Sequence, residues 1–254
     1  MRAARTTPPV TTTVAEGVAW MTLARPASGN RLDLEVMQGL TDACTAIALD
    51  PAVHVVVLQA GGRHFSVGLP PRHGWLPSAW PDGVAAIAAL GQPVLAAIDG
   101  EARGWGLALA LACDVRVVST RAIFSAPGFG TGRFPGGGIT QRLPRMIGTG
   151  RAMALLALGQ RLGARDAVAC GLACEAVSPS RLARTVAARG RALAARGPVA
   201  VRYAKEAVVR ALDLPLEEGM RLEHDLYVLL QTTADRREGL RAFLERRPPR
   251  FDAR

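Results

Sequence analysis

Two glycine-containing turns hold the residues of this 254-residue chain that could do chemistry. One is Arg63–Pro70 and the other is Asp99–Gly106; each follows a short β-branched run typical of a buried strand. The second turn also leads into an apolar helix over Leu107–Ala112. A glycine turn at the start of a helix leaves backbone N–H groups unpaired, with the positive end of the helix dipole behind them. The pattern predicts a site for an anion, or for an oxygen that gains negative charge.

Two other chemistries do not fit these turns. A dinucleotide-binding loop needs G-x-G-x-x-G, but Gly100, Gly104 and Gly106 have a different spacing, and no acidic residue stands at the expected later strand end. A serine hydrolase needs G-x-S-x-G, whereas Ser66 is preceded by a histidine at the first glycine position. Schiff-base chemistry is also disfavoured, because Lys205 is the single lysine.

Metal ligands and disulfides are not predicted. The four histidines lack the i, i+4 spacing of a helical zinc pair and have no cysteine at ligand spacing. The four cysteines contain no C-x-x-C pair and are too few for a disulfide scaffold, so we expect reduced thiols. The N-terminus runs from basic residues into threonine and proline rather than an apolar segment, so no secretory signal is predicted and a cytoplasmic location is expected.

The net charge of +10 comes almost entirely from arginine. Such an excess binds anions permanently and suits either nucleic acid or a phosphorylated small molecule. The arginines are spread along the chain and aromatic residues make up 5% of it, so no nucleic-acid partner is predicted. A generally arginine- and alanine-rich composition explains the charge equally well.

Strands alternate with helices in the first part of the chain, which predicts an α/β fold. Val10–Leu23 is predicted to form a hairpin, and Asp33 is placed to cap a helix that ends at Leu49. The other expected elements are strands at Val53–Leu58, Val94–Ile98 and Val115–Val118 and a small helix at Val84–Leu90.

Helices dominate after about Ile139, and no linker separates the two parts. We expect an α/β core over residues 1–195 and a helical oligomerisation region over 196–254. Arg103 interrupts the longest apolar stretch, Val94–Cys113, so no membrane span is predicted. The late elements expected are a strand at Leu172–Val177 and helices at Arg151–Leu158, Pro179–Ala195, Val199–Ala211, Leu216–Leu230 and Ala234–Glu245.

Several short motifs, in order from about Thr22 to Phe251, resemble the enoyl-CoA hydratase/isomerase, or crotonase, superfamily. They are Leu23–Asn30, His64–Gly68, Gln92–Gly100, Cys113-Asp114, Thr140–Leu143, and Asp235–Phe243 with Arg247–Phe251. The resemblance implies a spiral of ββα units with a helical C-terminal trimerisation region, and a homotrimer or dimer of trimers. It also implies an acyl-CoA thioester as ligand, with coenzyme A as part of the substrate and no separate cofactor, and a place in fatty acid metabolism.

By the same resemblance, the backbone amides of Leu69 and Trp105 form the oxyanion hole that holds the thioester oxygen. Fixed donors of this kind stabilise an enolate or a tetrahedral oxygen. The Trp105 indole is expected to narrow the acyl pocket, or else simply to pack in the core. The residues expected around the substrate are Arg25, Ser66, Gly68, Pro70, Gly104 and Gly128.

The chain departs from the family at its acidic positions, which align with Ala108, Gly128 and Gly136. Neither alanine nor glycine can transfer a proton, so ordinary hydration is not expected. A substitute could be Asp82, His73 or Glu101, although each has a plainer surface or turn role. Pro70 replaces a further acidic residue near the adenine. Coenzyme A phosphates could be bound by Arg25, then Arg63 or Arg72, and by Arg246 and Arg247 reaching a neighbouring subunit.

The sequence therefore leaves two functions open. One is an enzyme that needs only enolate stabilisation, and decarboxylation meets this requirement because loss of carbon dioxide generates the enolate. The other is a non-catalytic acyl-CoA binding or carrier protein.

Overall fold

A six-stranded sheet forms the centre of the protein. The computed structural model describes residues 7–71, 73, 76–127 and 132–253. The strand order is β1-β2-β3-β4-β6-β9, with β1 antiparallel to β2 and every other pair parallel. The strands are β1 Val10–Ala15, β2 Val18–Leu23, β3 Val55–Ala60, β4 Val94–Ile98, β6 Val115–Ser119 and β9 Glu175–Val177.

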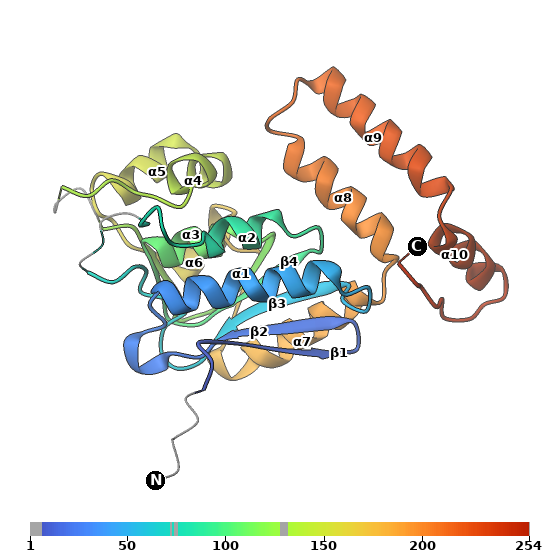
Figure 1. The fold of residues 1–254 in the computed structure, drawn as a ribbon. Helices are drawn as coiled ribbons and strands as arrows, with labels where there is room; N and C mark the ends of the chain where they lie inside the picture. The colour runs from blue at the N-terminus through green and yellow to red at the C-terminus, as the bar shows by residue number, and fades with distance from the viewer. Residues whose placement is uncertain (1–6, 72, 74–75, 128–131, 254) are drawn as a thin grey trace, which may run out of the picture.

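Helices cover both faces of this sheet (Figure 1). On one face, Val56 and Leu58 of β3 pack in a cluster with α1, α2 and α3; on the other, Val55 and Val57 pack against α7. Because parallel strands are buried on both sides, β3 and β4 are continuous apolar runs rather than alternating ones. These helices are α1 Leu34–Leu49, α2 Gly83–Ala89, α3 Trp105–Ala112 and α7 Pro179–Ala194.

A second, three-stranded sheet has the order β5-β7-β8. Its strands have two or three residues each, too short for a periodic signal, so the sequence does not predict them. The helices α4 and α6 are not predicted either; α4 begins after Gly138 and contains Pro144, so it lacks a usual start signal. The elements are β5 Glu101–Arg103, β7 Ile123–Ser125, β8 Leu162–Gly163, the short 3₁₀ helix Pro26–Ser28, and α4 Ile139–Ile147, α5 Thr149–Leu156 and α6 Ala164–Ala169.

The last three helices extend away from the rest of the protein (Figure 1). We call α8–α10 the arm: α8 Pro198–Arg210, α9 Leu216–Gln231 and α10 Ala234–Leu244. The expected α/β fold with a helical C-terminal region is confirmed, as are the first hairpin and the Asp33 cap, whose side chain accepts a hydrogen bond from the Val36 N–H at 3.0 Å. None of the helices in the described part of the chain has the length and apolar character needed to cross a membrane.

Candidate functional site

The two glycine turns lie side by side. They follow the carboxyl ends of the neighbouring parallel strands β3 and β4, where ligand sites of α/β sheets generally form. The Ser66 N–H donates to the Glu101 carbonyl at 3.1 Å, and the Arg103 N–H donates to the Ser66 carbonyl at 2.9 Å. The first turn is thereby attached to β5, the strand that leads into α3.

Glycine is required because the two backbones touch. A Cβ on Gly106 would lie 2.2 Å from the Ser66 carbonyl oxygen, and one on Gly100 would lie 1.8 Å from the Arg63 carbonyl oxygen. A Cβ on Gly68 would lie 2.7 Å from the Arg103 carbonyl oxygen and 3.1 Å from the Trp105 nitrogen, and Gly68 has a φ of +83°. A side chain at any of these positions would force the turns apart.

Two backbone N–H groups are available where the turns meet. Within the described residues, neither the Leu69 N–H nor the Trp105 N–H makes a hydrogen bond. Both residues line one cavity of about 250 Å³, and Trp105 is the first residue of α3. Unpaired donors at a helix N-terminus stabilise an oxygen that gains negative charge. The cavity therefore contains the donors that an oxyanion hole needs.

The Trp105 indole packs against the backbone at two glycines. A Cβ on Gly136 would lie 2.7 Å from Trp105 Cζ2 and 3.0 Å from Nε1; a Cβ on Gly137 would lie 3.2 Å from Cε3 and 2.6 Å from the Ala108 Cβ. The indole Nε1 is buried and has no hydrogen-bond partner among the described residues. An acidic side chain at Gly136 would therefore collide with the indole.

The residues expected around the substrate divide into lining and supporting roles. Gly68 and Gly104 line the cavity. Ser66 is fully buried; its hydroxyl donates to the Asn30 carbonyl at 2.8 Å and accepts from the Gly68 N–H at 3.1 Å, so it shapes the first turn. Pro70 follows Leu69, and its carbonyl accepts from the His73 N–H at 2.9 Å. Gly128 and Arg72 lie outside the described residues.

Of the three candidate substitutes for the acids, only His73 lines the cavity. Its ring packs edge-on against Trp80, with 4.9 Å between centroids. Asp82 instead caps α2, where its carboxylate accepts from the Val84 and Ala85 N–H groups at 3.0 and 2.9 Å. Glu101 lies 3.5 Å from the Arg161 guanidinium. Both carboxylates therefore have structural partners.

The arginines expected to bind coenzyme A differ in their surroundings. Arg25 forms an ion pair with Glu35 at 2.8 Å and also donates to the Thr7 carbonyl at 2.8 Å. Arg63 and Arg246 are exposed. Arg247 is held within the arm by two carboxylates, those of Glu238 and Glu245, each at 2.6 Å.

The cysteines nearest the helix α3 are not candidate nucleophiles. Burial raises the pKa of Cys113, at the end of α3, to about 12, and burial likewise raises that of Cys44 to about 12. Thiols with such pKa values stay protonated and unreactive near neutral pH. Asp99, beside the second turn, has a lowered pKa: partial burial opposes the shift, but hydrogen bonds from Arg121 and Ser119 outweigh it.

Sequence reasoning missed two basic residues of this cavity, Arg103 and Arg133. Arg103 was noticed only as an interruption of an apolar stretch. A signal was present, because strand alternation around the buried Ala102 places Arg103 on the face opposite to the core. Arg133 is distant in sequence from both turns, and its guanidinium donates to the Pro71 carbonyl across the cavity.

Comparison with known proteins decides the family. The family model for enoyl-CoA hydratase/isomerase matches residues 13–254. The chain belongs to the enoyl-CoA hydratase/isomerase family. A solved family member, an enoyl-CoA hydratase from Mycobacterium tuberculosis H37Rv, superposes with a TM-score of 0.91 over 98% of this chain and 100% of that chain, at 28% identity. An enoyl-CoA hydratase from Bacillus anthracis gives a TM-score of 0.89 at 32% identity, covering 97% of this chain and 100% of that one.

Curated relatives within the family are similar over nearly their whole length. The chain is 37% identical to the (E)-benzylidenesuccinyl-CoA hydratase of Thauera aromatica, covering 96% of this chain and 98% of the relative. It is 34% identical to the 2,3-dehydroadipyl-CoA hydratase of Escherichia coli K12, covering 93% of this chain and 96% of that protein. Family membership thus extends over the turns, the cavity and the arm.

Proposed function

We propose that this protein binds an acyl-CoA thioester and stabilises its enolate with the backbone N–H groups of Leu69 and Trp105. The observation that carries the proposal is that both N–H groups are unpaired within the described residues and line one cavity. Donors held by backbone need no reorganisation as charge develops on the thioester oxygen. Their positions are set by the glycine contacts between the turns.

Ordinary hydration of an enoyl-CoA is not part of this proposal. Hydration needs groups that add a hydroxide and a proton across the double bond, and such groups each contribute about 10²–10⁴-fold. Ala108 and Gly136 cannot transfer protons, and among the described residues that line the cavity there is no Asp or Glu. A reaction that makes its enolate by releasing carbon dioxide fits better. The C–C bond then breaks, its electron pair moves into the enolate, and water supplies the proton.

Product analysis by mass separates the possibilities. The protein is incubated with crotonyl-CoA, malonyl-CoA and methylmalonyl-CoA, and binding of each is measured by calorimetry. We expect no hydration of crotonyl-CoA and carbon dioxide release from a malonyl-type thioester. Binding without any turnover would favour the non-catalytic carrier instead. Rapid hydration of crotonyl-CoA would contradict the proposal, as would absence of binding.

We also propose that the arm mediates self-association into a trimer or a dimer of trimers. Its apolar side chains Tyr227, Leu240 and Phe243 are 60%, 48% and 80% exposed. Large exposed apolar areas are typical of interaction surfaces. Light scattering on the purified protein tests the proposal, since a monomeric mass at micromolar concentration would contradict it.

A cytoplasmic location is also proposed, because Cys44, Cys113, Cys170 and Cys174 are all free thiols.

A further inference from the structure

Two kinds of residue line the cavity at the two turns. The Trp105 indole lies against Gly136 and Gly137 and leaves no room for a side chain there. The lining also includes the basic residues Arg103 and Arg133, together with His73. No acidic residue lines the cavity in the described part of the chain. The charged side chains that line the cavity in the described part of the chain are therefore basic.

Of the two arginines, Arg103 has a side chain with which no described residue pairs. It is partly buried, yet its guanidinium makes no hydrogen bond or ion pair with any described residue. The nearest carboxylate along β5, that of Glu101, is already engaged with Ser125 at 3.4 Å and with Arg161 at 3.5 Å. A guanidinium that loses part of its water without gaining a carboxylate is costly unless a ligand completes it.

We propose that Arg103 binds a carboxylate carried by the acyl group, so that the protein selects an acyl-CoA whose short acyl chain ends in a carboxylate. The inference rests on the proposed binding of the thioester at Leu69 and Trp105. Arg103 directly precedes the Gly104-Trp105 pair and lines the same cavity as Leu69 and Trp105. Arg133, which donates to the Pro71 carbonyl, adds positive charge at the same cavity.

Binding of a matched pair of ligands tests the inference. Glutaryl-CoA and pentanoyl-CoA have the same chain length and differ in one terminal carboxylate, and both are titrated by calorimetry. We expect glutaryl-CoA to bind about tenfold more tightly, as one charge-assisted hydrogen-bonded pair contributes. Arg103→Gln should abolish this difference, because glutaryl-CoA binding falls to the level of pentanoyl-CoA binding. Arg165→Gln, which removes an exposed arginine of α6, should keep it.

The other outcomes are distinct. Equal binding of both ligands to the unaltered protein overturns the inference and leaves the proposed function standing. A preference that survives Arg103→Gln also overturns it, as does equal weakening of both ligands, since the arginine would then contact the coenzyme A portion. If neither ligand binds, the proposed function itself fails. The comparison in the unaltered protein decides the matter even if the Arg103 variant does not fold.

Discussion

The body, which is the part of the protein before α8, buries most of its large apolar residues, whereas the arm leaves many of its own exposed. In the body, Val55–Leu58 of β3 and Val94–Ile98 of β4 are buried between helices on both faces of the sheet. In the arm, α9 buries Leu226 alone, while Met220 is 63% exposed and Leu244 of α10 is 79% exposed. The body thus contains its own core, whereas the arm has an apolar surface that a single copy of the chain does not cover.

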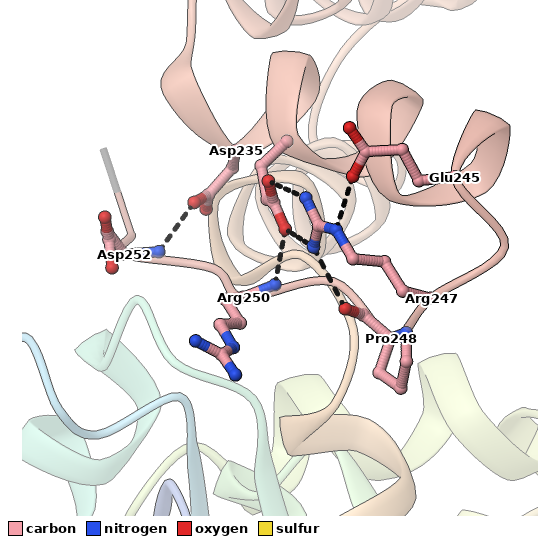
Figure 2. A network of polar contacts seen from close by, with 7 residues as sticks. Asp235, Glu245, Arg247, Pro248, Arg250 and Asp252 are labelled. Carbon is pink, nitrogen blue, oxygen red and sulfur yellow. Dashed lines mark hydrogen bonds and ion pairs between the residues drawn. The ribbon is translucent and has the colours of Figure 1, made fainter.

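Polar contacts, rather than a buried core, hold the C-terminal part of the arm together. Arg247 contacts Glu238 and Glu245, and the Arg250 N–H donates to Glu238 at 2.8 Å (Figure 2). Asp235, 4% exposed, accepts from the Asp252 N–H at 2.9 Å. These contacts fold the C-terminal tail back onto α10. Because the body has its own core, its stability should change little when residues on the surface of the arm are substituted. The stability of the arm should instead depend on a few specific polar contacts.

The largest expected effect is in the body. Phe65 is fully buried beside Ser66, so Phe65→Ala should lower the free energy of unfolding by about 3–5 kcal/mol through lost packing and a cavity. Denaturant unfolding measures this. The matched change in the arm, Phe243→Ala, removes a ring that is 80% exposed in a single copy of the chain; measured at a concentration low enough to keep copies apart, it should cost under ~0.5 kcal/mol. Equal costs would break the contrast between the two regions.

A smaller effect on stability but a large effect on the reaction is expected at the turns. Gly106→Ala places a methyl group 2.2 Å from the Ser66 carbonyl oxygen, which must move the Trp105 amide relative to Leu69. Loss of one oxyanion donor lowers turnover by about 10²–10³-fold. The rate of carbon dioxide release, or exchange of the acyl α-protons, measures it. Gly150→Ala in α5 is the control, because its Cβ meets nothing within 4 Å; similar rates in both variants would refute the assignment of the turns.

The body was predictable from the sequence because its strands are long enough to carry a pattern. The β-branched runs located β3, β4 and β6, with β3 two residues later than expected at Val55–Ala60. The strands β5, β7 and β8 carry no such pattern, since their pairing is set by tertiary contacts such as Arg103 opposite Ser125. The expected strand at Leu172–Val177 is shortened to Glu175–Val177.

The sequence predicts the candidate site only where backbone groups, rather than side chains, form it. The glycine spacing pointed to both turns, and the resemblance placed the two amides, a role that stays a prediction. Side-chain placement was not predictable in the same way. The contact of Trp105 with Gly136 joins segments far apart in the chain, and Asp82 was a candidate acid until its capping bonds were visible. The spacing of residues in the sequence indicates which ones are close along the chain, but not which distant ones the fold brings into contact.

The link between the two regions gives an intermediate effect. The Lys205 ammonium of α8 lies 2.7 Å from Asp114 in the body and donates to the Gln92 carbonyl at 2.9 Å. The side chains of Lys205 and Asp114 are 11% and 23% exposed, so Lys205→Met leaves the largely buried Asp114 carboxylate without its cation. We expect a loss of about 2 kcal/mol, measured by denaturant unfolding. Lys205→Arg should recover part of it, and a neutral Lys205→Met change would show that the arm is attached by apolar packing alone.

The smallest expected effect is the response of the arm to acid. Hydrogen bonds from Arg247, then from the Arg250 N–H, lower the pKa of Glu238 from 4.5 to about 2. A carboxyl group whose folded pKa is lowered stabilises the fold above its unfolded pKa, and this contribution is lost as the pH falls from about 4.5 towards 2. Glu238→Gln removes the contribution. The melting temperatures of the variant and the unaltered protein should therefore differ at pH 6 and converge near pH 2.

Glu217→Gln serves as the control for that comparison. The Glu217 carboxylate is 89% exposed and lies 3.9 Å from Arg221, a pair of the kind that contributes little to stability. Its melting temperature should match that of the unaltered protein across the same pH range. A Glu238→Gln difference that stayed constant from pH 6 to pH 2 would mean that packing of α10, rather than the Arg247 ion pair, holds the tail. The arm would then resemble the body more closely than its exposed apolar residues suggest.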